Sequence, residues 1–507
     1  MVVLVREDAG QRQAFWVRRA RTPAFAGFHA FPGGSVDAAD EHLAVSPPPG
    51  PLPDCGRGSD SARNDLGRSP WHRDAPLGAG EARLVVAAIR EAFEETGVLL
   101  ARLGTKVDVL GLRSKLLAGQ MTFQDVLEAS GATLDASMLA PIGRWVTPEF
   151  APKRFDARFF LARVPEGQEA QVWRGELERG EWIAPREALQ RWESGEALMH
   201  PPALHVLRTL ADSPDHELLE ALRAPPHVVD FVARRIEFQR GLRFVPLLTP
   251  TLPPARHTAC YLVGDRELLI VDPGSPWPEQ QQALHRLVDE LVMEGRTVRA
   301  IVLTHTHPDH VGGALAAKQA LGAPIWAHPK AARALPEINR ALCDGDVLEL
   351  GGDFGMALKV LHTPGHASDH LCLFELRSRA LLCGGMLSGA STIVVDPTDG
   401  DMEAYLGSLQ RLSDLQVRSV YPSHGEVMPD GPQRITEAIA HRRWREEKLL
   451  GVLAAGGPLA LDELTLRTYD DAPQAVLALA RRSALASLDW LERRGRVVRE
   501  GERFRLA

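Results

Sequence analysis

The chain has 507 residues, of which 45% are hydrophobic, and its formal net charge is −8. This length predicts about three domains of ordinary globular composition. No segment approaches the roughly 20 apolar residues that span a bilayer, which excludes a membrane-spanning protein, and the net negative charge gives no support to a nucleic-acid substrate.

The cysteines and the first residues indicate a reducing compartment. The start Met1 to Val5 is a short strand-like run with no basic region before it and no small-residue cleavage site behind it. We therefore predict a cytoplasmic protein. The five cysteines are scattered without paired spacing, as is usual where no disulfides form: Cys55, Cys260, Cys343, Cys372 and Cys383.

The first residues that indicate a particular chemistry lie in the N-terminal half. Phe31 to Gly34 and Asp40 precede the segment Arg90 to Val98, which reads REAFEETGV. Its glutamates stand at positions i, i+3 and i+4, so one helix face carries three carboxylates that repel one another unless a divalent cation lies among them. Hard oxygen ligands select Mg²⁺ or Mn²⁺. The alternative is an acidic helix face exposed to solvent.

These motifs resemble a Nudix box that is interrupted between its two halves. The segment from 41 to about 83, rich in proline, glycine, serine and arginine, stands where most Nudix proteins have a short turn, so we predict a mobile loop. Such a box is similar to the coenzyme A diphosphatase branch, and Trp145 to Pro148 and Arg154 to Phe160 add to the likeness. The Arg-x-His stretch that other coenzyme A diphosphatases carry ahead of Phe31 is absent.

The resemblance implies a Nudix α/β/α sandwich that cleaves a diphosphate-linked substrate, such as a coenzyme A derivative or a nucleotide, with Mg²⁺ or Mn²⁺. It implies that Glu94 is catalytic and that Arg90 orients a glutamate by a bidentate pair. The implied metal ligands are Glu91, Glu94 and Glu95. The glycines of the box are Gly33, Gly34 and Gly97. Candidates for phosphate contact, each with an ordinary surface arginine as the alternative, are Arg18, Arg19 and Arg154.

A proline-rich stretch marks the end of the first domain. We predict a first domain over residues 1–225, a second over 228–440 and a third over 441–507. Apolar periodicity predicts a helix over Ala203 to Leu210 at the end of the first domain. In the second it predicts two strands and an amphipathic helix, over His257 to Val263, Glu267 to Val271 and Pro278 to Glu294.

The run His305-Thr306-His307-Pro308-Asp309-His310 follows the apolar stretch Arg299 to Thr304. A strand that ends in a tight turn can project two of these histidines to one side while the aspartate and the third histidine reach round from the turn. Imidazole and carboxylate are the ligands that Zn²⁺ prefers. The alternative is a polar loop that is rich in histidine by chance.

Two later histidines strengthen the metal hypothesis. His366 lies in the turn TPGH and His424 in YPSHG, each after an apolar stretch. With them the chain resembles the metallo-β-lactamase superfamily from about 236 to 440, which implies an αββα sandwich. The resemblance implies that Asp272 braces the ligand loop by hydrogen bonding. It places one metal on His305, His307 and His366, and a second on Asp309, His310 and His424.

One family position departs from the pattern. The family has a bridging aspartate where this chain has Gly385. Without the shared carboxylate the second dication should bind more weakly or need another donor, so one or two Zn²⁺ ions are expected. Nearby donors that the sequence leaves unassigned are Cys383, Asp396, Asp399 and Asp401, the first of which is more often a buried apolar residue.

The ligand count indicates hydrolysis. Three histidines leave at least one position open on the metal, where bound water becomes hydroxide near neutral pH and can attack a carbonyl or phosphoryl centre. Asp309 would orient that water or hold the second ion, which makes it the predicted catalytic residue of this domain.

The third domain has the pattern of a winged helix. A short helix starts at Leu461, a longer one covers Ala475 to Arg494, and Gly495 to Leu506 reads as a hairpin. This resembles the domain that follows the catalytic domain in the β-lactamase-like protein 2 group of single-strand endoribonucleases. From His441 on there are 13 lysines and arginines against 10 aspartates and glutamates. The wing arginines are candidates for RNA contact, but the interleaved Glu500 and Glu502 favour a solvated, salt-bridged surface, and a packing or dimerisation role is a further alternative.

The sequence predicts a multidomain α/β and α+β hydrolase with a Nudix module, a metallo-β-lactamase-fold module and a winged helix. Its substrates are small molecules, and RNA stays open, as does the oligomeric state. For the second active site three hypotheses compete: thioester or ester hydrolysis, cleavage of an RNA phosphodiester by a single-strand endoribonuclease, and a catalytically weakened scaffold to an active Nudix domain.

Overall fold

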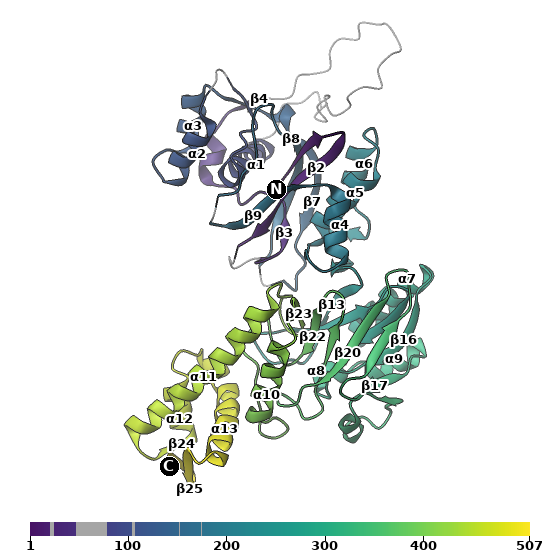
Figure 1. Cartoon of the computed structure of the whole chain (residues 1–507), viewed down its shortest axis with the longest axis vertical. Coiled ribbons are helices and arrows are strands. Elements are labelled where there is room, and N and C mark those ends of the chain that lie inside the picture. Colours follow the sequence, from purple (N-terminus) through teal and green to yellow (C-terminus); the bar gives the residue numbers. More distant parts are fainter. Residues whose placement is uncertain (21–24, 47–78, 104–106, 152, 174) are drawn as a thin grey trace. The chain divides into compact units, whose positions relative to one another are not determined.

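The computed structural model describes residues 1–20, 25–46, 79–103, 107–151, 153–173 and 175–507. Most of the predicted insert over 41–83 lies outside the described residues. The chain forms two compact units, Met1–Glu193 with Ala197–Phe238, and Ser194–Glu196 with Gln239–Ala507. Both combine helices with sheets, so the chain is a multidomain α/β protein as predicted (Figure 1).

The first unit is built on a mixed sheet. Its strands run in the order β3-β2-β1-β8-β7, and β9 pairs with β2. Strands β1 and β8 are parallel, whereas β1 and β2, and β7 and β8, are antiparallel. The strands are β1 (Val2–Asp8), β2 (Gln11–Arg19), β3 (His29–Ala30), β7 (Ala140–Val146), β8 (Asp156–Arg163) and β9 (Leu177–Ile183). A smaller sheet joins β4 (Val45–Ser46), β6 (Thr133–Asp135) and β5 (Ala101–Arg102).

Alternation along β1 gives this sheet two apolar faces. Val2 and Leu4 pack into a core that contains the apolar residues of α1, while Val3 and Val5 pack on the other side with α4, α5 and α6. This is the α/β/α sandwich expected from a period of two along buried strands. The helices are α1 (Ala79–Thr96), α2 (Val109–Leu117), α3 (Phe123–Ser130), α4 (Pro185–Glu193), α5 (Pro201–Asp212) and α6 (Leu218–Arg223).

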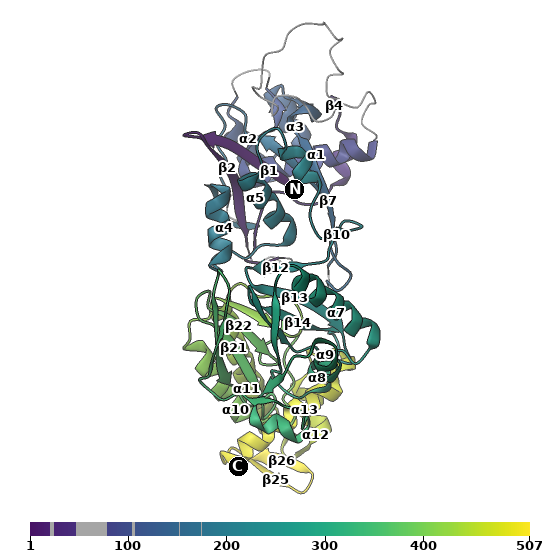
Figure 2. The same cartoon turned by 90° about the vertical axis from the view of Figure 1, so that its right-hand side faces the viewer.

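The second unit contains two large sheets with helices outside them, followed by the small sheet of its C-terminal elements (Figure 2). The first sheet runs through β13 (Leu242–Leu248), β14 (His257–Val263), β15 (Glu267–Val271), β16 (Thr297–Val302), β17 (Ile325–Ala327) and β18 (Arg340–Ala341). The second runs through β19 (Val347–Leu350), β20 (Met356–His362), β21 (Leu371–Glu375), β22 (Ala380–Gly384) and β23 (Ser419–Pro422). The join between the units falls within β12 (Ile236–Gln239).

Each sheet of this sandwich has its own helical cover. Apolar side chains of α7 (Pro278–Met293) and α9 (Ala314–Leu321) share a core with the first sheet. The second sheet shares a larger core with α10 (Met402–Ser413) and α11 (Gly431–Gly456). This larger core also takes in residues beyond position 456, so the sandwich and the C-terminal elements are packed as one body.

The C-terminal elements form the winged helix that the sequence predicted. They are β24 (Leu459–Ala460), α12 (Leu461–Thr468), the 3-10 turn Gln474–Val476, α13 (Leu477–Arg493), β25 (Val497–Glu500) and β26 (Arg503–Leu506). The three strands pair in the order β24-β26-β25. Helix α11 continues without a break through the predicted boundary at 440–441, because no glycine or proline interrupts it there. The division of the chain at 225, 228 and 440 stays a prediction.

Candidate metal centres

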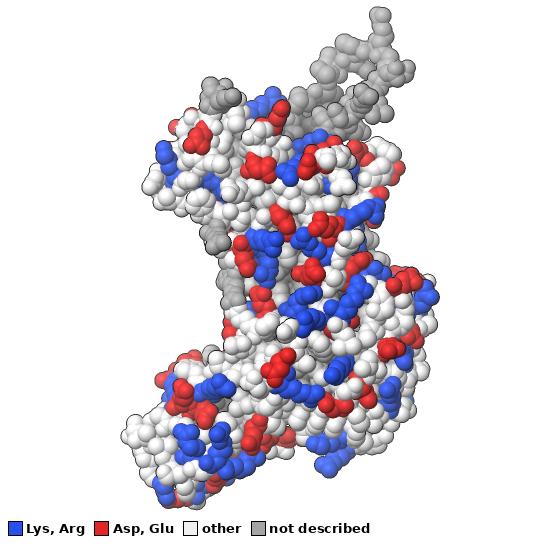
Figure 3. Space-filling model, viewed as in Figure 1, with Lys and Arg blue, Asp and Glu red and all other residues white. Residues whose placement is uncertain are grey.

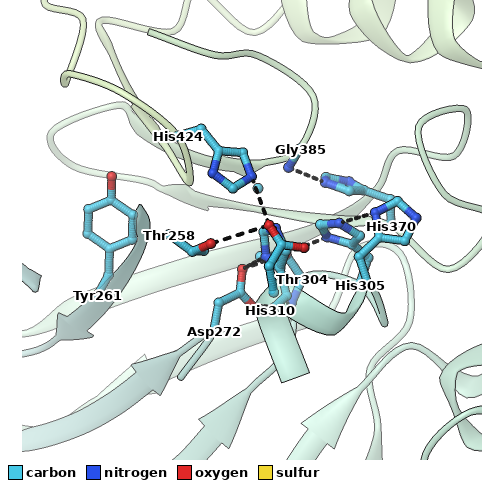
Figure 4. Close-up of polar contacts among 12 residues, drawn as sticks. Thr258, Tyr261, Asp272, Thr304, His305, His310, His370, Gly385 and His424 are labelled. Atoms are coloured by element: carbon cyan, nitrogen blue, oxygen red, sulfur yellow. Dashed lines mark hydrogen bonds and ion pairs between the residues drawn. The ribbon is translucent and has the colours of Figure 1, made fainter. Parts of the chain in front are cut away.

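The histidine-rich run lies where strand β16 ends and helix α8 (Pro308–Val311) begins. His305 and His307 are in the connecting loop, while Asp309 and His310 are in the first turn of the helix. Pro308 suits the first helical position, where its missing N–H would have no partner inside the helix. The strand gives way to the helix within six residues, and the ring centroids of His305 and His310 lie 3.9 Å apart (Figure 4).

Asp272 ties this loop to the end of the neighbouring strand β15. Its carboxylate accepts hydrogen bonds from the Thr304 backbone N–H at 2.8 Å, the Thr304 hydroxyl at 2.6 Å and Nδ1 of His310 at 2.7 Å. Asp272 is buried and has a φ of +52°, a left-handed conformation that aspartate tolerates better than most residues. These contacts fix the direction in which the loop leaves the sheet.

The first candidate metal site consists of His305, His307 and His366. One ligand atom from each lies within 4.8 Å of the others. Since the Thr304 hydroxyl donates to Asp272, it accepts from Nδ1 of His305 at 2.9 Å, which leaves Nε2 of His305 with its lone pair. That Nε2 lies 3.1 Å from Nδ1 of His307, within hydrogen-bond distance, so the two nitrogens are close enough to ligate one cation.

His366 completes this site from the turn after β20. Its Nδ1 donates to the carbonyl oxygen of Val394 at 2.9 Å, so its Nε2 is the free ligand atom. Burial and the charge of His307 lower the pKa of His366 to about 3. Burial also lowers the pKa of His305 well below its usual range. Both imidazoles are therefore neutral near pH 7, as metal binding requires.

The second candidate site consists of Asp309, His310 and His424, whose ligand atoms also lie within 4.8 Å of one another. Asp309 Oδ2 is 3.4 Å from Nε2 of His424 and accepts a hydrogen bond from the Thr258 hydroxyl at 3.3 Å (Figure 4). Nδ1 of His424 donates to the carbonyl oxygen of His257 at 3.2 Å. Burial raises the pKa of Asp309, but His310 and His424 outweigh it, so its pKa falls below the usual value.

At Gly385, the position to which the family resemblance assigns a bridging aspartate, the chain supplies no carboxylate. The backbone N–H of Gly385 donates to Nε2 of His370 at 2.9 Å (Figure 4). A Cβ atom at this position would lie 2.3 Å from Cδ2 of His366 and 2.5 Å from its Nε2. The imidazole of His366 therefore fills the space beside Gly385.

The donors that the sequence left unassigned have other partners. Cys383 is fully buried, its Sγ donates to the carbonyl oxygen of Leu387 at 3.6 Å, and burial raises its pKa well above the usual thiol value. Asp396 pairs with Arg482 at 3.1 Å. Asp401 pairs with an arginine of α13, as described below, and Asp399 accepts from the Ser368 backbone N–H at 3.3 Å. None of these contacts replaces the bridging carboxylate.

Sequence reasoning missed His370. It is fully buried, with its ring centroid 5.0 Å from that of His305. The Thr363 hydroxyl donates to Cys372 and therefore accepts from Nδ1 of His370 at 2.9 Å, and Nε2 accepts from Gly385. Both ring nitrogens are thus occupied, so His370 supports the wall of the site. The only signal in the sequence is its position four residues after His366.

The acidic residues of the Nudix-like box meet around Arg90 on helix α1. Arg90 forms a bidentate pair with the buried Asp40, at 2.8 and 3.0 Å. It also donates to Glu91 at 3.0 Å and to Glu94 at 3.1 Å. The bidentate partner is therefore Asp40, whereas the sequence analysis expected a glutamate. The aspartate takes this place because the 3-10 turn Ala38–His42 positions it opposite the arginine.

The three glutamates of the box do not converge as the histidines do. Among the described residues, the two histidine groups are the ones whose three ligand atoms lie within 4.8 Å. Glu95 instead accepts from the Gly33 backbone N–H at 2.6 Å, and burial raises its pKa to about 7. Burial also raises the pKa of Glu91 and of Glu94. Arg90 thus holds Glu91 and Glu94 near each other, while Glu95 is bound to Gly33.

Gly34 leaves room for an acid of the box, and Gly97 follows the end of the helix that carries the acids. A Cβ at Gly34 would lie 2.4 to 2.6 Å from the carboxyl group of Glu91. Gly97 has a φ of +77° just after α1, the left-handed conformation with which helices often end.

The three candidate phosphate ligands lie in different surroundings. Arg18 pairs with Glu178 at 2.8 Å, and Arg154 donates to the carbonyl oxygen of Thr147 at 3.0 Å. Arg19 is close enough to Glu95 to lower its pKa, and its buried Nε has no hydrogen-bond partner among the described residues. Of the three, Arg19 is the one whose charge acts on the acidic residues of the box.

Several arginines of the winged helix form ion pairs with acids of this unit. Arg493 pairs with Asp401 at 2.6 Å, Arg505 pairs with Glu500 at 2.6 Å, and Arg499 pairs with Asp489. Figure 3 accordingly shows positive and negative side chains interspersed over the visible face. Within the described part of the chain, no helix has both the length and the apolarity to cross a membrane.

Comparisons with known proteins fit this arrangement. The family model of the metallo-β-lactamase superfamily matches residues 253–424, that of the NUDT19 Nudix domain residues 11–210, and that of the β-lactamase-associated winged helix domain residues 460–505. The first two are families of hydrolases, so the chain is a hydrolase.

Three curated relatives resemble the C-terminal part of the chain. The β-lactamase-like protein 2 homolog of Caenorhabditis elegans is 32% identical over 227 residues, 43% of this chain and 73% of the relative. The lactamase-like protein aptB of Emericella nidulans is 31% identical over 228 residues, 42% of this chain and 69% of the relative. The atrochrysone carboxyl ACP thioesterase of Aspergillus chevalieri is 29% identical, over 43% of this chain and 70% of the relative.

The two histidine groups lie inside the matched segment, in the stretches that follow strands β16, β20 and β23 of the two sheets. The chain belongs to the metallo-β-lactamase superfamily and carries, in addition, a NUDT19-type Nudix domain and a β-lactamase-associated winged helix.

Proposed function

We propose that the metallo-β-lactamase-fold centre hydrolyses a thioester or a related acyl ester. The observation that carries this proposal is the convergence of three neutral imidazoles beside a second group of two imidazoles and a carboxylate. The name of one relative, a thioesterase, supports the choice of an acyl substrate. A partner domain that acts on coenzyme A derivatives would suit the same substrates.

The donor set fits Zn²⁺, with His305, His307 and His366 as the ligands of the tighter site. A bound Zn²⁺ supplies a Lewis acid and lowers the pKa of water to about 7. Asp309 is the proposed catalytic residue because its lowered pKa keeps it ionised near neutral pH, ready to orient the attacking water. Thr258 positions that carboxylate through its hydrogen bond.

We infer that the second ion, on Asp309, His310 and His424, binds less tightly than the first. The support is Gly385, which leaves two dications a few Å apart without a shared anionic ligand. The expected metal content of the protein after dialysis is therefore closer to one ion than to two per chain.

Cleavage of RNA and a scaffold role are the other two outcomes to test. The pairing of Arg493, Arg499 and Arg505 with acids lowers the positive charge that single-stranded RNA would meet, which favours the acyl substrate. Gly385 is the feature that keeps the scaffold role open.

Hydrolysis of an acyl-coenzyme A thioester and of single-stranded RNA should be compared in the wild type, His305→Ala and His328→Ala. His328→Ala is the matched control, because this histidine of the same domain lies outside both groups and stacks on His362 with ring centroids 4.2 Å apart. We expect thioester turnover that falls at least about 100-fold in His305→Ala and stays near the wild-type rate in the control. RNA cleavage that falls in His305→Ala and stays near the wild-type rate in His328→Ala would point to the endoribonuclease. Equal hydrolysis rates in all three proteins would point to a scaffold.

For the N-terminal site we propose cleavage of a diphosphate-linked substrate, such as a coenzyme A derivative or a nucleotide, with Mg²⁺ or Mn²⁺. The support is the matching family model and the network in which Arg90 holds Asp40, Glu91 and Glu94 together. Arg19 is the proposed phosphate ligand, since it is the candidate arginine whose charge acts on Glu95.

Glu94→Gln should abolish Mg²⁺-dependent diphosphate cleavage, because the amide loses the negative charge that holds the cation. Glu81→Gln, in the exposed first turn of the same helix, is the matched control. A substrate panel of coenzyme A, its acyl esters, dinucleotides and capped RNA would give the turnover rates. Retained turnover in Glu94→Gln would show that another group holds the cation.

A further inference from the structure

The orientation of His366 depends on a segment outside the ligand loops. The carbonyl oxygen of Val394 accepts from Nδ1 of His366 at 2.9 Å, and this bond keeps Nε2 turned toward the other two histidines. Val394 follows β22 by ten residues and belongs to no helix or strand. The position of its carbonyl group is therefore set by whatever holds residues 393–395.

Side chains from two C-terminal helices hold this segment on either side of Val394. A guanidinium N–H of Arg442, on α11, donates to the carbonyl oxygen of Ile393. The hydroxyl of Ser483, on α13 of the winged helix, accepts from the Val395 backbone N–H at 3.2 Å. Both side chains are buried, so water does not compete for these two backbone groups.

Packing reinforces the two hydrogen bonds. Ile393 and Val395 are buried in the core that also contains apolar residues of α11, α13 and the wing. The guanidinium of Arg442 lies 5.1 Å from the ring of Tyr405, whose hydroxyl donates to the carbonyl oxygen of Met386 at 2.8 Å. One layer of contacts thus joins the winged helix to the wall of the first metal site.

Ion pairs hold the continuation of the same segment. Arg482 pairs with Asp396 at 3.1 Å, and Arg493 pairs with Asp401 at 2.6 Å. Both arginines belong to α13. The backbone N–H of Asp401 donates to the carbonyl oxygen of Gly365 at 2.9 Å, next to His366 in the chain. Side chains of α13 therefore hold both ends of the segment 395–401, which leads from Val394 to the neighbourhood of His366.

We propose that Ser483 and Arg442 are positioning residues of the first metal site. By holding residues 393–395 they place the Val394 carbonyl group, which in turn fixes the tautomer and the direction of His366. The winged helix then sets the metal affinity of the hydrolase centre, whether or not it touches a substrate. This inference rests on the proposed metal centre.

The test compares Ser483→Ala with Ser487→Ala in the full-length protein. Ser487 is the matched control because it is a buried serine one turn further along α13, whose hydroxyl donates within the helix to the Ser483 carbonyl oxygen at 2.9 Å. Removal of a group that orients a ligand's partner costs metal affinity, and we expect a loss of about 3- to 10-fold in Ser483→Ala, with less than about 2-fold in the control. Zn²⁺ affinity is measured by competition with a chromogenic chelator.

A second readout separates positioning from mere loss of stability. The visible absorption of the Co²⁺-substituted protein reports the ligand geometry, and we expect its bands to shift in Ser483→Ala and in Arg442→Lys but not in Ser487→Ala. Equal affinities and spectra in the wild type and Ser483→Ala would overturn the inference and leave the metal centre standing. A wild-type protein that retains no Zn²⁺ would overturn the metal centre itself, and the inference with it.

Discussion

At the residue scale, Gly385 matters for space as well as for charge. A Cβ at Gly385 would lie 2.3 Å from the His366 ring, a distance that real Cβ contacts do not show. The ring of His366 occupies the space that a larger residue would need, while the backbone N–H of Gly385 donates to His370. We therefore expect an aspartate at this position to displace His366, a proposed ligand of the first metal.

Two substitutions at Gly385 separate the steric effect from the missing charge. Gly385→Ala adds the Cβ alone, so we expect it to weaken Zn²⁺ binding at the first site by at least about tenfold. Gly385→Asp adds the same Cβ with a carboxylate, so we expect a higher metal content than in the alanine variant. Metal content after dialysis, measured by mass spectrometry, gives the comparison. Equal content in Gly385→Ala and Gly385→Asp would mean that the carboxylate does not reach a second ion.

At the scale of elements, one helix links the hydrolase sandwich to the winged helix. Helix α11 carries Ile435, Leu449 and Leu453 into the larger core and Arg442 to the segment beside His366. We therefore expect Ala440→Pro to weaken both the fold and the metal site. Ala440 is exposed, so the substitution acts on the helix and not on packing.

Proline at this position removes one N–H and clashes with the preceding turn, which costs about 3 kcal/mol in a helix interior. Ala440→Gly, the control, costs about 1 kcal/mol. Urea unfolding and Zn²⁺ affinity of both variants are the measurements. Similar stabilities for the proline and glycine variants would show that α11 is not required as one continuous helix.

Regular elements could be predicted from the sequence because their signal is local. The strands expected over 257–263 and 267–271 coincide with β14 and β15, and the helix from Pro278 ends one residue before the expected end. Each has a periodic apolar pattern that two facing layers bury. The predicted start of the third domain, at residue 441, lies within α11. The charged residues there give no local signal that one helix continues, because a helix tolerates them at exposed positions.

The candidate site could be predicted only where its residues lie in a motif. His305, His307 and His366 stand in short runs whose spacing is distinctive. His370 and Val394 could not be assigned roles, since one acts through burial and the other through a backbone carbonyl group, which leaves no trace in residue type. The contacts of segments outside helices and strands depend on tertiary packing, so they cannot be predicted from a local sequence pattern.

At the scale of the whole molecule, the cores divide the chain into two bodies. The first unit buries its residues on the two faces of its own sheet, and the second joins the sandwich and the winged helix through one continuous core. Since a domain with its own core unfolds cooperatively, we expect the full-length chain to show two unfolding transitions. The winged helix should unfold together with the metal centre.

Metal removal should then act on one transition alone. A ligand at about 1,000 times its dissociation constant stabilises the unit that binds it by about 4 kcal/mol, so chelation of Zn²⁺ should lower the unfolding temperature of the second unit. Calorimetry of the wild type with and without chelator measures this shift, and Ala440→Pro identifies the transition, because position 440 lies in the second unit. A Zn²⁺-selective chelator that lowers both transitions equally would contradict the assignment of this metal to the second unit alone.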